Sequence, residues 1–265
     1  MNRPQRARRA WKISLCARGP RQSRVFVTAI MMSIRENIAA VRERIAFAAR
    51  RAGRASGGIA LMAVTKTHPP EIIREAHAAG LRLFGENRVQ EFAGKAPALA
   101  DLAAAEWHMI GHLQTNKAGK AAELFSAVDS IDSLKLAEKL DAAARALNKS
   151  LSVLIEINVG GEAAKSGLAP DSRELDDILR SASRFEALEF RGLMTVPPFS
   201  DDIEQARPYF RRLRELRDAI AARSLPTIRM DILSMGMSHD FEVAVEEGST
   251  CVRVGTAIFG ERTTA

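Results

Sequence analysis

Lys66 follows a short apolar run, residues 59–65, whose composition predicts a β-strand. Because side chains alternate along a strand, Lys66 shares a face with Met62 and Val64, and these small or flexible neighbours suit the interior of a barrel. Partial burial disfavours the charged form of a lysine, and the neutral amine attacks carbonyl carbons. Lys66 is therefore a candidate for covalent chemistry with a carbonyl compound. The alternative is a solvated lysine at a strand end.

Two segments near the C-terminus have the composition of an anion-binding site. Ser238 precedes a short helix predicted to start near Asp240, and backbone N–H groups at such a start bind anions together with a hydroxyl. Gly255 and Thr256 belong to the last predicted strand, where a glycine allows close approach of the backbone. In α/β barrels, phosphate sites often form after strands seven and eight. The alternative is that Ser238 only caps its helix.

Strand-like and helical segments alternate along the chain in a way that would position these residues. Strands are predicted at 59–66, 81–87, 107–111, 127–131, 151–159, 190–196, 230–235 and 250–259. Helices are predicted at 33–53, 70–79, 89–99, 116–125, 134–148, 172–185, 203–223 and 240–247. Eight such units favour an α/β fold, a single (β/α)8 TIM-type barrel with an extra N-terminal helix. A doubly wound open sheet is the alternative.

The basic character of the chain belongs to its first residues. The net charge is +7, but residues 1–31 hold eight of the 39 Lys and Arg residues and no acid, which leaves 31 basic and 32 acidic residues in the remainder. A body that is nearly neutral argues against nucleic-acid binding. We expect 1–31 to be a basic leader, disordered or upstream of a misassigned start, with a targeting segment as the alternative. The barrel is expected over 32–265, its first helix starting with a capping box of Ser33 and Glu36.

Composition restricts the class of protein further. The chain has no apolar run of eighteen residues, so no membrane-spanning helix is expected. Cys16 and Cys251 are too few for a disulfide framework, which favours a reducing, cytoplasmic location. The five histidines do not have the spacing of metal ligands, and no metal site is expected.

Several long motifs resemble one known family. They are Ala63–Thr67, Phe84–Glu91, Trp107–Lys117, Lys165–Gly167, Gly192–Thr195, Ser234–Asp240 and Gly248–Gly260. Together, and in this order, they resemble the pyridoxal phosphate homeostasis protein family, which is related to the barrel domain of alanine racemase. The resemblance covers residues 33–262 and leaves the leader outside.

The resemblance implies that pyridoxal 5′-phosphate (PLP) is the cofactor and assigns roles to individual residues. Lys66 would hold PLP as an aldimine, and Ser238 would bind the phosphate together with backbone groups of Met237, Gly255 and Thr256. Arg253 would lie against the pyridine nitrogen, and Asn87 would contact the ring or its hydroxyl. His108 is either a pocket residue or a core histidine.

An arginine beside the pyridine nitrogen bears on whether the protein is an enzyme. It disfavours protonation of that nitrogen and so weakens the ring as an electron sink. The resemblance therefore implies a non-enzymatic protein of intracellular PLP homeostasis that holds PLP and supplies or buffers it. Its partners would be PLP and PLP-dependent apo-enzymes, with no nucleic acid and no membrane. It would be a monomer or weak dimer.

Two other functions are considered, a PLP-dependent amino-acid racemase-like enzyme and an aldolase-type lysine barrel without cofactor. A two-base racemase of the related type takes a tyrosine from a second domain. Here the barrel is expected to end near Arg262, and the single tyrosine, Tyr209, lies in a predicted helix. Asp240 and His112 are the remaining candidate acids for a racemase. An aldolase-type lysine would not require Arg253.

Overall fold

The computed structural model describes residues 33–162 and 165–261. Eight parallel strands form a closed barrel in which each strand pairs with the next and the last pairs with the first. The strands are β1 Ala60–Val64, β2 Leu83–Glu86, β3 Glu106–Met109, β4 Ala127–Ile131, β5 Leu151–Glu156, β6 Leu188–Met194, β7 Ile228–Met237 and β8 Cys251–Val254. The predicted single TIM-type barrel is confirmed, and the open sheet is excluded.

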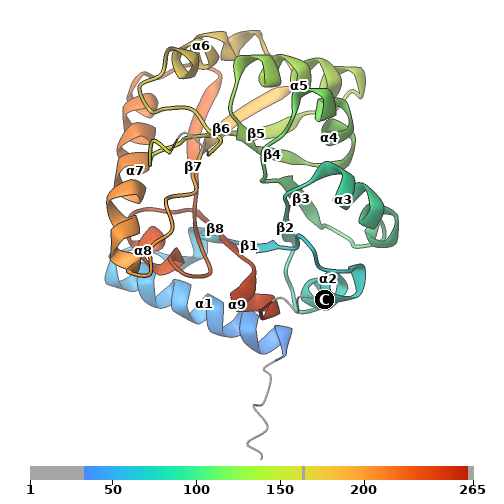
Figure 1. Cartoon of the computed structure of the whole chain (residues 1–265), viewed down its shortest axis with the longest axis vertical. Helices are drawn as coiled ribbons and strands as arrows, with labels where there is room; N and C mark the ends of the chain where they lie inside the picture. The colour runs from blue at the N-terminus through green and yellow to red at the C-terminus, as the bar shows by residue number, and fades with distance from the viewer. Residues whose placement is uncertain (1–32, 163–164, 262–265) are drawn as a thin grey trace, which may run out of the picture. The chain divides into compact units, whose positions relative to one another are not determined.

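Helices form a ring around the strands (Figure 1). They are α1 Ile34–Arg51, α2 Pro70–Ala78, α3 Val89–Lys95, α4 Ala118–Leu124, α5 Leu134–Ala146, α6 Arg173–Ser181, α7 Arg207–Ala222, α8 Phe241–Glu246 and α9 Thr256–Phe259. Short 3-10 helices are η1 Ser56–Gly58, η2 Ala96–Leu99, η3 Thr115–Lys117, η4 Ala182–Arg184 and η5 Ile203–Ala206. Among the described residues, no helix is both long and apolar enough to cross a bilayer.

Helix α1 is the predicted extra N-terminal helix. It begins with the expected capping box, in which the Ser33 hydroxyl accepts from Glu36 N–H and the Glu36 carboxylate accepts from Ser33 N–H. Its apolar stripe includes Ile38, Val41 and Ile45 and is buried. The helix lies beside α8 and α9 (Figure 1) and so covers the joint where β8 meets β1. The predicted leader, residues 1–31, lies outside the described residues.

Alternation along the strands separates an outer core from the barrel interior. On the outside, Phe84 of β2 stacks on Trp107 of β3, with ring centroids 4.9 Å apart, and Phe92 of α3 lies 4.7 Å from the Trp107 ring. On the inside, a Cβ on Gly85 would lie 2.7 Å from the sulfur of Met62. The interior is therefore filled by side chains at this level. The candidate site residues lie at or just after the ends of the strands in the sequence and therefore at the carboxyl end of the barrel.

One predicted strand is too long. The pattern at 250–259 predicted a strand throughout, but β8 ends at Val254 and Thr256–Phe259 form the short helix α9. Backbone N–H groups of Ile258 and Phe259 donate to Gly255 O instead of to a neighbouring strand. The apolar, β-branched composition concealed this turn, since helix and strand cannot be distinguished by period in so short a run. Lys66 likewise lies two residues beyond the end of β1.

Candidate functional site

The backbone on both sides of Lys66 is fixed by hydrogen bonds. Thr65 donates its N–H to Gly85 O of β2 at 3.0 Å and its hydroxyl to Glu86 Oε1 at 2.7 Å. Thr67, in the left-handed region at φ 67°, donates its N–H to Glu91 Oε1 at 2.6 Å. The turn that carries Lys66 is therefore anchored to β2 and α3. Lys66 itself is partly buried.

A buried ion-pair cluster lies under this turn. Lys95 Nζ donates to Thr65 O at 3.0 Å and to Glu91 Oε1 at 2.6 Å, and it lies 3.2 Å from Glu86 Oε1. The Glu86 side chain is 0% exposed and that of Lys95 is 12% exposed. Burial raises the pKa of Glu86, against the opposing effects of the Thr65 hydroxyl and Lys95. Glu86 thus has a structural ion-pair role.

The joint of β8 with β1 brings the Lys66 turn to the last strand. Ala63 is in register with Val254, and a Cβ on Gly255 would lie 3.5 Å from Val64 O. Beyond the strands, the rings of His68 and Phe259 lie 4.5 Å apart. The loop after β1 and helix α9 therefore lie against each other. We call this joint the β8–β1 seam.

Ser238 is the first residue after β7, in the loop that leads to α8, and β7 is the neighbour of β8. Its hydroxyl oxygen accepts from the N–H groups of Gly255 at 3.1 Å and Ala257 at 3.3 Å, so the hydroxyl proton is directed to another acceptor. Ser238 thus joins the two loops instead of merely capping α8, whose N-cap is Asp240. The N–H of Met237 donates to Asp240 Oδ1 at 2.6 Å. The Met237 N–H is thus bonded to a carboxylate in the structure. Ser238 and Gly255 lie next to each other, as predicted.

Arg253 is buried in the barrel interior, with 3% of the residue exposed. Its guanidinium donates to Ser234 Oγ at 2.8 Å and to Thr195 O at 2.7 Å. Burial lowers the pKa of Arg253, whereas nearby groups, Asp129 and Glu156 among them, raise it. An arginine nevertheless remains charged at neutral pH. A fixed positive charge therefore lies between β7 and β8, beside the Ser238 loop.

Two further carboxylates face this interior charge. Glu156, the last residue of β5, is 8% exposed, and its Oε2 has no hydrogen-bond partner among the described residues. Burial and the charge of Asp132 raise its pKa to about 7. Asp129 of β4 pairs with His108 Nδ1 at 3.1 Å. Burial lowers the pKa of His108, but Asp129 and Glu106 together raise it more, so the net shift of the pKa is upward. His108 is a partnered interior histidine.

Asn87, directly after β2, has a buried side-chain oxygen that accepts no hydrogen bond from the described residues. Its backbone is fixed by a close approach, because a Cβ on Gly111 would lie 2.4 Å from Asn87 O. A buried acceptor without a donor is unfavourable and indicates a missing partner. A hydroxyl-bearing ligand would supply the donor, so this residue fits the predicted contact with PLP.

The chain is similar to known proteins over nearly all of the barrel. The family model described as alanine racemase, N-terminal domain, matches residues 36–263. A protein of Aquifex aeolicus named pyridoxal phosphate homeostasis protein is 46% identical over 231 residues, which are 87% of this chain and 99% of that protein. The chain belongs to the pyridoxal phosphate homeostasis protein family. The resemblance found in the sequence motifs is thereby confirmed.

Solved structures agree with this membership. The structure of PipY from Synechococcus elongatus with PLP bound is 37% identical, with a TM-score of 0.75, and the match covers 86% of this chain and all of that one (100%). Alanine racemase from Streptomyces coelicolor is 22% identical, with a TM-score of 0.62 over 85% of this chain and 59% of the racemase. The likeness to the racemase shows a shared fold alone. Members of the family are named as homeostasis proteins and not as enzymes.

The sequence did not reveal some residues of the candidate site. Lys95 had no predicted role, although its spacing from Glu91 is the i, i+4 spacing of a helical ion pair. Asp129 was not predicted to pair with His108, because the two belong to different strands. Tyr209 lies in α7 and packs against the core, as expected. Among the described residues, no cluster of His, Cys, Asp or Glu has the arrangement of a metal site.

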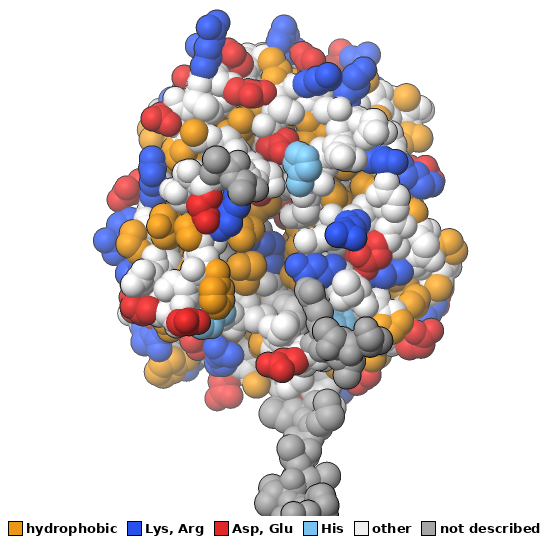
Figure 2. Space-filling model, in the orientation of Figure 1, with side chains coloured by type: hydrophobic (Ala, Val, Ile, Leu, Met, Phe, Trp, Pro, Cys, Tyr) orange, Lys and Arg blue, Asp and Glu red, His pale blue; other side chains and the backbone are white. Residues whose placement is uncertain are grey.

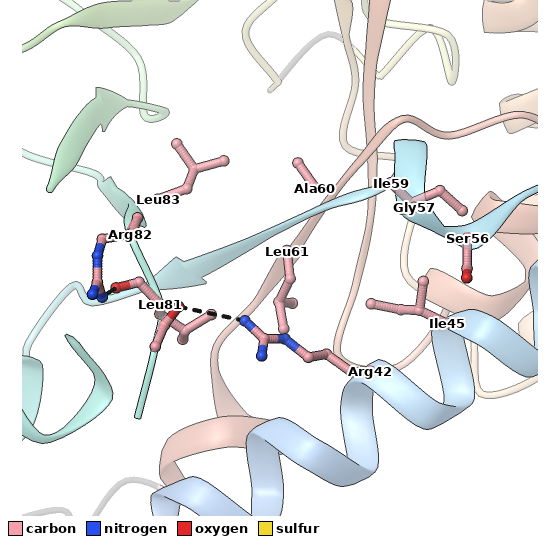
Figure 3. A pocket seen from close by; sticks show the side chains of 11 residues that line it. Arg42, Ile45, Ser56, Gly57, Ile59, Ala60, Leu61, Leu81, Arg82 and Leu83 are labelled. Carbon is pink, nitrogen blue, oxygen red and sulfur yellow. Dashed lines mark hydrogen bonds between the residues drawn. The ribbon is translucent and has the colours of Figure 1, made fainter. Parts of the chain in front are cut away.

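A cavity of ≈ 440 Å³ lies at the opposite end of the barrel, where β1 and β2 begin (Figure 3). Arg42 and Ile45 of α1 point towards Leu61 and Leu81 there, and no predicted site residue lines it. In barrels the chemistry occurs at the carboxyl ends of the strands, so we do not assign this cavity to PLP. On the face shown in Figure 2, basic and acidic side chains are interspersed, without the single-sign patch of a nucleic-acid surface.

Proposed function

We propose that this protein binds PLP covalently through Lys66 and serves intracellular PLP homeostasis, holding the cofactor and supplying or buffering it. The observation that carries the proposal is the β8–β1 seam, which joins the anchored Lys66 turn to the loops of Ser238 and Gly255. PLP carries its aldehyde and its phosphate ester on adjacent carbons of one ring. An amine and an anion cradle on neighbouring strands match that close spacing.

Each predicted residue then has a defined task. Ser238 directs its hydroxyl proton to the phosphate, with Gly255 and Thr256 allowing the backbone to approach. Met237 contributes to the same loop, although its N–H is engaged by Asp240. Lys66 would hold PLP through its side-chain amine, and bound PLP would supply the aldehyde for that covalent bond.

The ring is held by the barrel interior. Asn87 offers its unpartnered buried oxygen to the ring hydroxyl. Arg253 places a fixed positive charge towards the pyridine nitrogen, where it keeps the nitrogen unprotonated. An unprotonated ring withdraws electrons weakly, so the site holds the cofactor without promoting carbanion chemistry. We therefore propose a carrier without catalytic activity, acting in the cytoplasm as a monomer or weak dimer.

The proposed recipients are PLP-dependent apo-enzymes. PLP is a reactive aldehyde, and its retention as a lysine adduct limits side reactions until it is transferred. A near-neutral body and the interspersed charges of Figure 2 support partners other than nucleic acid or a membrane surface. Substantial alanine racemisation by the purified protein would support the racemase-like alternative.

Peptide mapping after borohydride reduction tests the proposal. The protein is incubated with PLP, reduced and digested, and we expect a phosphopyridoxyl group on the peptide that contains Lys66. The variant Lys66→Ala is expected to lose the mark and to keep its circular dichroism spectrum. Lys120→Ala, which changes an exposed lysine on α4, serves as the matched control and keeps the mark. A mark that persists elsewhere in Lys66→Ala, or none in the unmodified protein, would refute the assignment.

A further inference from the structure

A second cavity, of ≈ 260 Å³, lies at the carboxyl ends of β2 and β3. We call it the β2–β3 cavity. Its polar lining comes from the loops that follow these two strands and from the first residues of α3 and the end of η3: Asn87, Arg88, Gln90, His112, Gln114 and Lys117. These residues belong to two of the motifs that identify the family, yet all except Asn87 lack a role in holding PLP. The phosphate cradle at Ser238 lies elsewhere, between β7 and β8.

The two cations of this cavity have no close ion-pair partner in the described part of the chain. Within residues 33–162 and 165–261, neither Arg88 nor Lys117 lies within ion-pair distance of a carboxylate, whereas nearby Lys95 pairs with two carboxylates and His112 pairs with Asp132 at 2.8 Å. Arg88 is exposed to solvent and interacts with the Glu91 carboxylate only at longer range. Lys117 is half-buried, so its ammonium is partly removed from water. A partly desolvated cation without a counterion is unfavourable, and an oxyanion from solution would compensate it. The cavity is thus electrostatically complementary to an anion.

The hydrogen-bonding groups indicate the rest of the ligand. The amides of Gln90 and Gln114 line the cavity and can donate to oxygen atoms. Asn87, whose buried Oδ1 is assigned to the ring hydroxyl of PLP, lines this cavity as well. A volume of ≈ 260 Å³ lies below the range of about 300–1,000 Å³ for pockets of drug-sized ligands. The ligand is therefore a small molecule.

We propose that the β2–β3 cavity binds the oxyanion group, carboxylate or phosphate, of a small metabolite, with Arg88 and Lys117 neutralising its charge. The proposal does not rest on the chemistry of Lys66, since neither cation belongs to the predicted PLP site. Asn87 alone is shared, so this ligand and PLP would lie next to each other at the barrel mouth.

Helix α3 gives such a site a physical connection to Lys66. The helix begins at Val89, which lines the cavity, and its Glu91 and Lys95 bind the N–H of Thr67 and the carbonyl of Thr65. A ligand in the β2–β3 cavity would therefore contact the same helix that anchors the Lys66 turn.

The test uses the full chain without PLP and two probes, inorganic phosphate and acetate, at constant ionic strength. Backbone and side-chain amide resonances are followed by nitrogen-15 NMR. We expect saturable shifts of the Gln90 and Gln114 side-chain amides with at least one probe. Since each lost charge-assisted hydrogen bond weakens binding about tenfold or more, Arg88→Gln and Lys117→Gln are each expected to weaken it by that factor. Arg42→Gln, in the cavity at the other end of the barrel, is the control and leaves the affinity unchanged.

The outcomes separate the possible sources of the ligand. Saturation by phosphate alone indicates a phosphorylated metabolite, and saturation by acetate alone indicates a carboxylic acid. Absence of saturable shifts with both probes, or equal affinity in the Arg88→Gln and Lys117→Gln variants, would overturn the proposal. The phosphopyridoxyl mark on Lys66 is measured in the same variants, so failure of this site and failure of PLP binding are distinguishable.

Discussion

Replacing Lys95 by methionine tests whether the buried cluster under the Lys66 turn stabilises the protein. The change keeps an unbranched side chain only one atom shorter but removes the charge that faces Glu86, whose side chain is 0% exposed. Removing one partner of a buried ion pair costs about 3–5 kcal/mol. We expect the free energy of unfolding to fall by about 3 kcal/mol, the lower end of this range. The loss is limited because Glu86 keeps its hydrogen bond from Thr65 and can take up a proton.

The loss in Lys95→Met should depend on pH. Burial already raises the pKa of Glu86, and Lys95 opposes that rise, so the variant raises it further. A carboxyl whose pKa is higher in the folded state contributes stability below its unfolded pKa, and this contribution is lost as the pH rises through the folded pKa. The stability deficit of the variant is therefore expected to be larger at pH 8 than at pH 5.

Urea unfolding followed by circular dichroism measures both effects. Lys120→Met removes a lysine from an exposed ion pair with Glu123 and should change the unfolding free energy by less than about 0.5 kcal/mol. The double variant Lys95→Met/Glu86→Gln should recover part of the loss, because the fully buried carboxylate that lacks a cation is then removed. A loss in Lys95→Met below about 1 kcal/mol, or one independent of pH, would refute the reasoning.

Two further predictions concern the barrel interior. Glu156 has a pKa of about 7 in the fold against 4.5 ordinarily, so its stabilising contribution is present below pH 4.5 and lost as the pH rises to about 7. Glu156→Gln should therefore be more stable than the unmodified protein at pH 8, by up to about 3 kcal/mol, and an unchanged pH slope in urea unfolding would contradict this. A Cβ on Gly192 would lie 1.8 Å from Ile232 O. Gly192→Ala should lower stability by about 3 kcal/mol in the same assay, whereas Gly94→Ala, with open space around it in α3, should raise it by about 0.5–1 kcal/mol; equal effects of the two changes would show the interpretation to be wrong.

The order of strands and helices was accessible from sequence because it depends on local periodicity. Each short apolar run predicted as a strand contains one in the structure, and the Ser33 signal marked the start of α1. Closure of the barrel then makes the first and last strands neighbours, which is why Lys66 and Gly255 could be expected near each other.

The contacts that were missed depend on pairings between distant elements. Lys95 meets Glu86 and Thr65 only because α3 folds back over β2. The unpartnered oxygen of Asn87 is visible only in three dimensions, since sequence gives residue types and not which donors are lacking. Helix α9 was predicted as strand because the N–H groups of Gly255 and Ala257, just beyond β8, donate to the hydroxyl of Ser238, which lies in another loop.

The β8–β1 seam has a consequence for how the protein is made. Lys66 and Arg253 are separated by 187 residues of chain, so a nascent chain carries Lys66 long before the residues proposed to bind the phosphate and the pyridine nitrogen emerge. Contacts of such long sequence separation form late, because loop closure must be achieved first. A chain truncated before β8 would lack part of the proposed site, however well its earlier strands fold. With PLP held as proposed, its retention would report that the barrel has closed.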